Sequence, residues 1–219
     1  FFHECAHAID DISVPDSIGF IKLGEIDYRD VYRDDSGRSL QDAVMEDVKS
    51  HLRQSVHQAA NETGTELSSF HVERVVEHLV SRERGGMSDP TLNHIYERTL
   101  SYYDREVLVD NNYKTINGTQ YHTGGAKNEA VDDVFGGATN NKIGSGYMHR
   151  HPQESYFNNE YYYWYDKDGK ATGAQSSEFF AEHFSHNMTR SPVGQIDQTR
   201  QYFTDSCDFV DRMVLDLVP

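Results

Sequence analysis

Two histidines and a glutamate near the start of the chain have the spacing of a metal site. The sequence begins FFHECAHAID, in which His3 and His7 are four residues apart and Glu4 follows the first histidine. On an α-helix, residues four apart lie on one face, so both imidazoles can point at a single ion. Zinc binds histidine nitrogen at about 2.0–2.1 Å, and catalytic zinc takes three protein ligands and a water molecule. The pattern therefore predicts a zinc (Zn2+) site whose third ligand lies further along the chain.

Glu4 is the candidate general base of this site. Beside the first ligand, it is placed to accept a proton from a water molecule whose pKa the metal lowers to about 7. The HExxH pattern encodes this arrangement in metallopeptidases. A chain with 12 histidines can also produce the pattern by chance, and both histidines would then lie on a solvated helix.

The segment SSEFFAEHFSH supplies the carboxylates that such a site requires. Glu178 and Glu182 are four residues apart on one face of a predicted helix, and Phe179, Phe180 and Phe184 would bury the other face. Carboxylates on a helix packed into an aromatic core are costly unless a cation meets them. We predict that Glu178 is the third zinc ligand and that Glu182 fixes the ring of a ligating histidine through a hydrogen bond.

HECAHAIDD and SSEFFAEHF together resemble the catalytic domain of gluzincin metallopeptidases of the anthrax-lethal-factor type, in which a HExxHxxD helix is followed by a helix bearing EFFAE. The resemblance implies the same zinc ligands, general base and outer carboxylate as above. It also places Asp10 at the D position, as a helix cap or hydrogen-bond partner.

The resemblance is incomplete at the transition-state tyrosine, because the position seven residues before the ligand glutamate is Ala171. A group that steadies the oxyanion or binds substrate must then come from elsewhere, and the candidates are Tyr147, His149, Tyr161, Tyr162, Tyr163 and Tyr165. The strands that usually precede a zincin active-site helix would lie upstream of Phe1. We therefore expect this chain to be the C-terminal part of a longer one.

A second resemblance covers the segment DDVFGGATNNKIGSGYMHRHPQESYF and the acidic helix after it. These residues resemble the C-terminal portion of minor head (minor capsid) proteins of tailed phages. The resemblance implies a zincin domain that is part of a virion. His149 and His151 would then lie near the cleft, or they are polar loop histidines.

Most of the elements that must position these residues are predicted to be helical. Apolar periodicity and turn residues predict helices at about 3–11, 39–62, 68–83, 90–109, 176–188 and 195–217. A short hairpin is predicted at Asn117-Gly118, and an aromatic strand ends in a tight turn at Asp168-Gly169. The expected fold is α+β, predominantly helical and zincin-like, with the active-site helix crossing the Glu-bearing helix beside a small aromatic sheet. We expect a single domain, 1–219, with a helical insertion at about 39–110.

Charge and composition narrow the classes of partner. The chain has 20 Lys and Arg against 36 Asp and Glu, a net charge of -16. This charge repels phosphate backbones and anionic lipids, which argues against direct nucleic-acid or membrane binding and favours a neutral or basic peptide. No apolar run approaches the roughly 20 residues that span a bilayer. Two cysteines at opposite ends form neither a disulfide framework nor a CxxC pair.

Three functional hypotheses follow from these features. The first is a zinc-dependent metalloendopeptidase that cleaves a protein or peptide substrate and belongs to a phage virion, with other head proteins as partners. The second is a structural minor head protein that retains an inactive zincin fold, in which the metal serves stability. The third is a secreted or injected metalloprotease toxin directed at a host protein.

Overall fold

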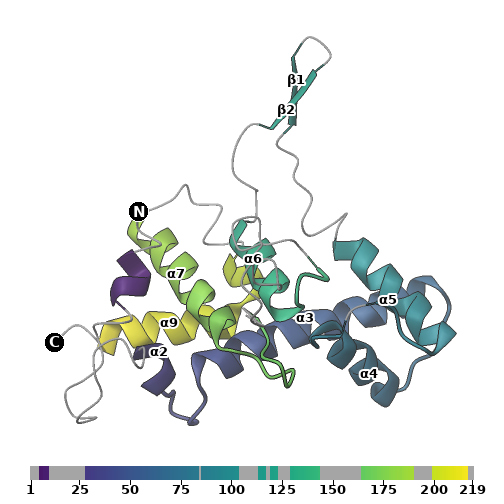
Figure 1. Cartoon of the computed structure of the whole chain (residues 1–219), viewed down its shortest axis with the longest axis horizontal. Coiled ribbons are helices and arrows are strands. Elements are labelled where there is room, and N and C mark those ends of the chain that lie inside the picture. Colours follow the sequence, from purple (N-terminus) through teal and green to yellow (C-terminus); the bar gives the residue numbers. More distant parts are fainter. Residues whose placement is uncertain are drawn as a thin grey trace. The chain divides into compact units, whose positions relative to one another are not determined.

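Helices dominate the residues that the computed structural model describes, which are 5–9, 28–83, 85–103, 113–116, 119–122, 129–143, 164–189 and 199–216 (Figure 1). The backbone divides into two compact units. The first comprises Phe1–Asp47 and Gly173–Pro219, and the second comprises Val48–Thr172. The second unit includes most of the insertion predicted at 39–110 but extends further, to Thr172. None of the described helices is long and apolar enough to cross a membrane.

The longest described helix, α3 (Leu40–Glu62), forms where the sequence has its most regular apolar stripe. Its buried side chains recur every four residues, which keeps them on one face: Leu40, Val44, Val48, Leu52 and Val56. Ser39 and Asp42 cap its start reciprocally. The Asp42 backbone N–H donates to Ser39 Oγ at 3.1 Å, and the Ser39 N–H donates to Asp42 Oδ2 at 3.0 Å. The prediction of a helix at 39–62 is confirmed.

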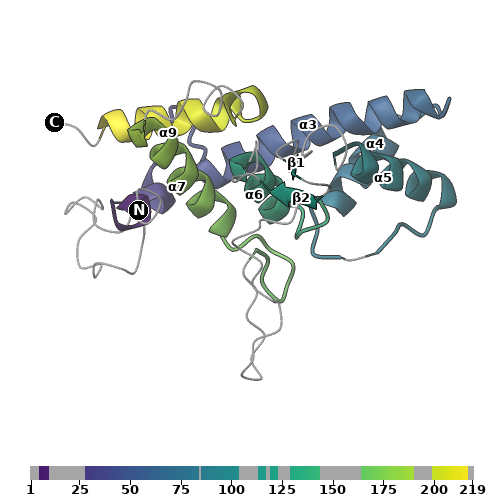
Figure 2. The same ribbon diagram turned by 90° about the horizontal axis from the view of Figure 1, so that it is seen from above.

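The first unit also contains α2 (Tyr28–Val31), α7 (Ala174–Thr189) and α9 (Thr204–Asp216). The helices α7 and α9 lie side by side (Figures 1 and 2). Aromatic rings fill the space beside them: Phe179 meets Phe203 edge-on at 5.8 Å between centroids, and Tyr32 meets Phe209 at 5.4 Å. The single helix predicted at 195–217 is interrupted at Phe203, which separates the helical residues 199–202 from α9.

The second unit contains α4 (Ser69–Leu79), α5 (Pro90–Tyr102) and α6 (Glu129–Ala138). Ser68 and Asp89 cap α4 and α5. The prediction of a helix at 68–83 is too long, since α4 ends at Leu79. Side chains from distant positions bind the carbonyls that follow: Lys142 Nζ donates to Leu79 O at 3.2 Å, and Tyr165 Oη donates to Val80 O at 2.6 Å.

Helix α6 was not predicted from the sequence. Val131, Val134, Phe135 and Ala138 have helical spacing and are buried, but two glycines interrupt the pattern at 136 and 137. Packing explains why position 137 is a glycine. A Cβ at this position would come within 2.8 Å of Trp164 Cζ3, so the indole can lie against the helix only because the side chain is absent.

Two strands, β1 (Tyr113–Ile116) and β2 (Thr119–His122), form an antiparallel pair. Their register pairs Ile116 with Thr119 and leaves two residues between the strands, so the hairpin predicted at Asn117-Gly118 is confirmed. The turn at Asp168-Gly169 is confirmed too, because Gly169 has φ 79° and Tyr165 pairs with Ala171 across it. The rest of the aromatic strand lies outside the described residues, so the aromatic sheet and the zincin-like arrangement stay predictions.

We predict that Cys207 resists alkylation in the folded protein. Burial raises the pKa of this thiol to about 12, so the thiolate fraction at pH 8 is on the order of 10⁻⁴. Native protein treated with iodoacetamide and analysed by mass spectrometry should carry label at the half-buried Cys5 and not at Cys207. Unfolding in urea should expose both thiols. Equal native labelling of the two cysteines would contradict the buried position of α9.

Candidate metal centre

A short helical segment at the start of the chain carries His7. Residues 5–9 are helical, as the HExxH pattern predicts, and Ala6 is fully buried while His7 is half-buried. This orientation turns the alanine to the core of the first unit and leaves the imidazole at its edge. The other predicted residues of this helix, His3, Glu4 and Asp10, lie outside the described residues.

Helix α7 carries the predicted carboxylates, and its first turn is tightly held. Gly173 precedes it with φ 89°, a conformation that favours glycine. The Ser176 hydroxyl donates to Gly173 O at 2.8 Å, and the Ser176 backbone N–H donates to Gln41 Oε1 of α3 at 3.1 Å. The bond to Gln41 satisfies a backbone N–H that a helix start otherwise leaves without a partner, and it also fixes where the next residues of α7 point.

The aromatic residues of α7 determine its rotation. Phe179 and Phe180 are fully buried, and the predicted third member of the apolar face, Phe184, is half-buried and stacks on Phe180 at 5.9 Å. With these rings in the core, the side chain of Glu178 is almost entirely removed from solvent, and the residue is only 4% exposed. A carboxylate in such a position is costly unless a cation or hydrogen-bond donors face it.

The structure brings two predicted ligands from opposite ends of the chain together. His7 Nε2 lies 3.7 Å from Glu178 Oε2. This distance is too long for a hydrogen bond. Two donor atoms that each lie about 2.0–2.2 Å from a tetrahedral ion are roughly 3.3–3.6 Å apart. The 3.7 Å between these two atoms lies within the range of an ion pair and just above that of two zinc ligands. Their role as zinc ligands therefore stays a prediction.

Ser177 is a site residue that the sequence analysis missed. Its Oγ lies 3.3 Å from Nδ1 of His7, across 170 positions of sequence. Two consecutive residues of α7 thus contact the two nitrogens of one imidazole ring. No local pattern could show this, because successive side chains on a helix point about 100° apart and only the approach of the first helix places His7 between them.

Glu182 lies one turn after Glu178 and is paired along the same helix. Its Oε2 is 3.9 Å from Nε2 of His186, and both side chains are largely buried. Burial lowers the pKa of His186, and the charge of Glu182 opposes this shift. Since the histidine that Glu182 was predicted to orient can be His3, its role as an outer carboxylate stays a prediction.

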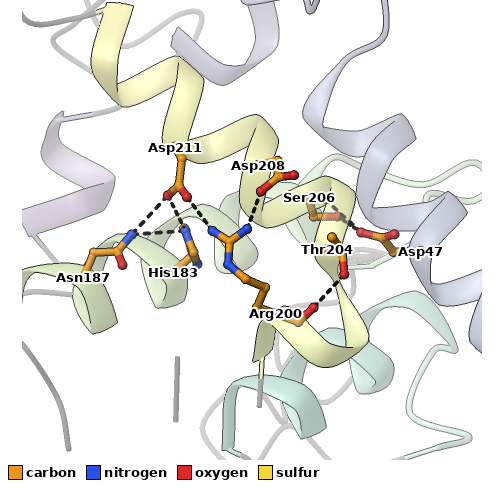
Figure 3. Close-up of polar contacts among 8 residues, drawn as sticks. All are labelled: Asp47, His183, Asn187, Arg200, Thr204, Ser206, Asp208 and Asp211. Atoms are coloured by element: carbon orange, nitrogen blue, oxygen red, sulfur yellow. Dashed lines mark hydrogen bonds and ion pairs between the residues drawn. The ribbon is translucent and has the colours of Figure 1, made fainter. Parts of the chain in front are cut away.

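A polar network ties α7 to α9 (Figure 3). His183 is 1% exposed, stacks on Phe179, and shares a hydrogen bond of 2.8 Å between Nε2 and Asp211 Oδ1. Arg200 binds Asp211 Oδ2 at 2.5 Å and also bonds to Asp208. The hydrogen bond from His183 is the main reason that the pKa of Asp211 is lowered. His183 is five positions after Glu178, which is about 140° of helix rotation away from it.

The predicted oxyanion candidates have different outcomes. Tyr165 is buried, and its hydroxyl lies 2.6 Å from Val80 O and 2.5 Å from Ala138 O within the second unit. Desolvation raises the pKa of this phenol. A hydroxyl already bonded to two carbonyls has no proton to offer a substrate, so the geometry does not favour Tyr165 in that role. The other candidates, Tyr147, His149, Tyr161, Tyr162 and Tyr163, lie outside the described residues.

The described residues contain only part of the predicted ligand set. Among them, no group of three or more His, Cys, Asp and Glu side chains is arranged to hold a metal ion. His3 is not among these residues. Comparison with family models, with curated proteins and with solved structures finds no match. The chemistry of the site must therefore be argued from its own residues.

We predict that Asp211→Asn loosens α7 by weakening the bond to His183. The loss should be about 1 kcal/mol at pH 7, since the imidazole is buried but the Asp211 carboxylate is 40% exposed and partly screened. Because the folded pKa is lowered, this stabilisation is present above the unfolded pKa of about 3.9 and disappears as pH falls through the folded pKa. Urea titrations at pH 7 and pH 2.5 should show the difference shrinking.

The matched control for this prediction is Asp205→Asn. The Asp205 side chain is 57% exposed, and its Oδ2 lies 3.5 Å from Nη1 of Arg38. Its removal should change stability by less than about 0.5 kcal/mol. Equal effects of the two substitutions would show that the bond between His183 and Asp211 does not hold the helix.

Proposed function

We propose that this chain is a zinc-dependent metalloendopeptidase domain. In this proposal His3, His7 and Glu178 hold the metal and Glu4 is the general base. One observation carries the proposal: the buried carboxylate of Glu178 lies 3.7 Å from an imidazole nitrogen of the HExxH segment, although the two residues come from opposite ends of the chain. The sequence alone predicts both residues as ligands of one site.

The energetics of burial support a cation at this position. An ionised carboxylate removed from water costs several kcal/mol even after the protein relaxes. His7 faces this carboxylate, with its Nε2 3.7 Å from Oε2 of Glu178. A divalent ion between the two groups would reduce that cost further and would use both as ligands. The donor set, imidazole and carboxylate, is one that zinc accepts.

The residues have separate tasks in the proposed reaction. Zinc, when bound, supplies Lewis acidity toward the scissile carbonyl and toward water. His7 and Glu178 would hold the ion from their own helices. Glu4 would accept a proton from the attacking water and return it to the leaving amine. A hydroxyl or imidazole would steady the oxyanion, and the remaining candidates are Tyr147, His149, Tyr161, Tyr162 and Tyr163.

The class of substrate follows from charge. With 36 acidic against 20 basic residues, the protein attracts neutral or basic peptides. The resemblance of the segment that starts at Asp132 to phage minor head proteins supports a virion as the place where it acts. A secreted or injected effector with the same chemistry is the alternative.

A second candidate function is a structural protein that keeps the metal for stability. Two observations favour it: Ala171 stands where the related peptidases have their transition-state tyrosine, and the hydroxyl of the nearby Tyr165 is bonded to backbone carbonyls. In that case zinc binding would couple to folding without turnover.

Zinc binding should depend on His7 and Glu178. We expect about one zinc per chain by metal analysis of the wild type, and a thermal shift on adding zinc. His7→Ala and Glu178→Gln should lose both, whereas His57→Ala, which removes an exposed histidine from α3, should retain both. In the metal-free protein, Glu178→Gln should be as stable as the wild type or more stable, because it removes a buried charge. A wild type that binds no zinc would refute the proposed function.

Peptide cleavage should depend on Glu4. In a casein or peptide-library assay, Glu4→Gln should keep its zinc and lose about 10²–10⁴-fold in kcat/KM, the usual contribution of a general base. A zinc-bound wild type that cuts nothing would decide for the structural alternative. Unchanged cleavage by Glu4→Gln would reject the proposed mechanism.

A further inference from the structure

We propose that Ser177 is a positioning residue for the metal centre, accepting a hydrogen bond from Nδ1–H of His7 so that the unprotonated Nε2 faces Glu178. This inference rests on the proposed function and deepens it. It adds a residue that neither the HExxH pattern nor the acidic pair contains. The two contacts that carry it come from consecutive residues of α7.

The two nitrogens of the His7 ring lie at different distances from their neighbours on α7. Nδ1 lies 3.3 Å from Ser177 Oγ, within reach of a hydrogen bond, whereas Nε2 lies 3.7 Å from Glu178 Oε2, beyond it. A neutral imidazole carries one N–H, and the partner of one nitrogen decides which nitrogen keeps the proton. With the metal on Nε2, as the proposed function requires, the single N–H of the neutral ring is on Nδ1, and Ser177 Oγ is within reach to accept it.

The neighbouring serine shows that the contact is specific. Serine in a helix commonly turns its hydroxyl back to a carbonyl of the preceding turn. Ser176 does this, donating to Gly173 O at 2.8 Å. The backbone N–H of Ser177 donates to the same carbonyl of Gly173 at 3.1 Å. The Ser177 hydroxyl, however, lies beside Nδ1 of His7. Two adjacent serines of one helix turn thus have different tasks.

The framework around Ser177 holds the hydroxyl in place. Gln41 of α3 binds the backbone N–H of Ser176, and the buried rings of Phe179 and Phe180 follow on the core side. The position of Ser177 Oγ is therefore set by the same packing that places Glu178. A ring oriented from one side and an ion held from the other is the arrangement that outer partners of zinc-binding histidines provide.

The test compares Ser177→Ala with Ser177→Thr, which keeps the hydroxyl, and with Ser176→Ala as the matched control. Zinc affinity is measured by competition with a chelator, and the visible spectrum of the Co2+ form reports ligand geometry. We expect Ser177→Ala to bind zinc about 10–100-fold more weakly and to change the Co2+ spectrum. Ser177→Thr should restore both, Ser176→Ala should leave both unchanged, and the metal-free melting temperature should be the same in the wild type and Ser177→Ala.

Three results would overturn this inference. Wild-type affinity and an unchanged Co2+ spectrum in Ser177→Ala would show that the hydroxyl does not orient the ring. Failure of Ser177→Thr to restore affinity, or an equal loss in Ser176→Ala, would assign the effect to helix stability. If the wild type binds neither zinc nor Co2+, the proposed function itself is refuted. This result is separate from the other three, because it is obtained with the wild type alone.

Discussion

The carboxylate of Glu178, enclosed by aromatic packing and facing His7, is the constraint on which the first unit depends. A buried charge is costly, so a fold tolerates it only where something opposes that charge. Here one group that faces the carboxylate is the imidazole of His7 from the other end of the chain, 3.7 Å away. The helix that carries Glu178 must therefore be held in place along its whole length.

Three sets of contacts hold α7, and they differ in chemistry. Its first turn is bound through Ser176 to Gln41 of α3. Its middle is packed by Phe179 and Phe180, which are fully buried. Its second half is tied through His183 to Asp211 of α9, which Arg200 also binds. Polar bonds fix the direction of α7 and apolar packing fixes its rotation, so Glu178 faces His7.

The same interaction creates a trade-off between stability and the proposed chemistry. A neutral residue at position 178 would relieve the cost of burial but would remove a ligand. Strain of this kind is expected at functional sites and is compensated elsewhere in the structure. The network around Asp211 and the capped start of α3 are the compensating features in this unit.

The sequence by itself predicted most helices and the approach of His7 to Glu178, whose role as metal ligands stays a prediction. Four-residue periodicity predicted α3, because an apolar stripe can be buried only on one face, and the spacing of His7 and of Glu178 named both residues as ligands. The short apolar pattern of α6, broken by glycine, gave too weak a signal. Local patterns also carried no information about the end of α4, where Lys142 and Tyr165 bind the last carbonyls.

Only the tertiary structure decided which side chains surround the predicted ligands. Ser177 reaches His7 because two helices far apart in sequence approach each other, and Tyr165 turns its hydroxyl to the carbonyls of Val80 and Ala138 rather than to a substrate. The physical reason is the range of the interactions. Periodicity reports which face of an element is buried, whereas the partner of a polar group depends on contacts between elements, which no local spacing encodes.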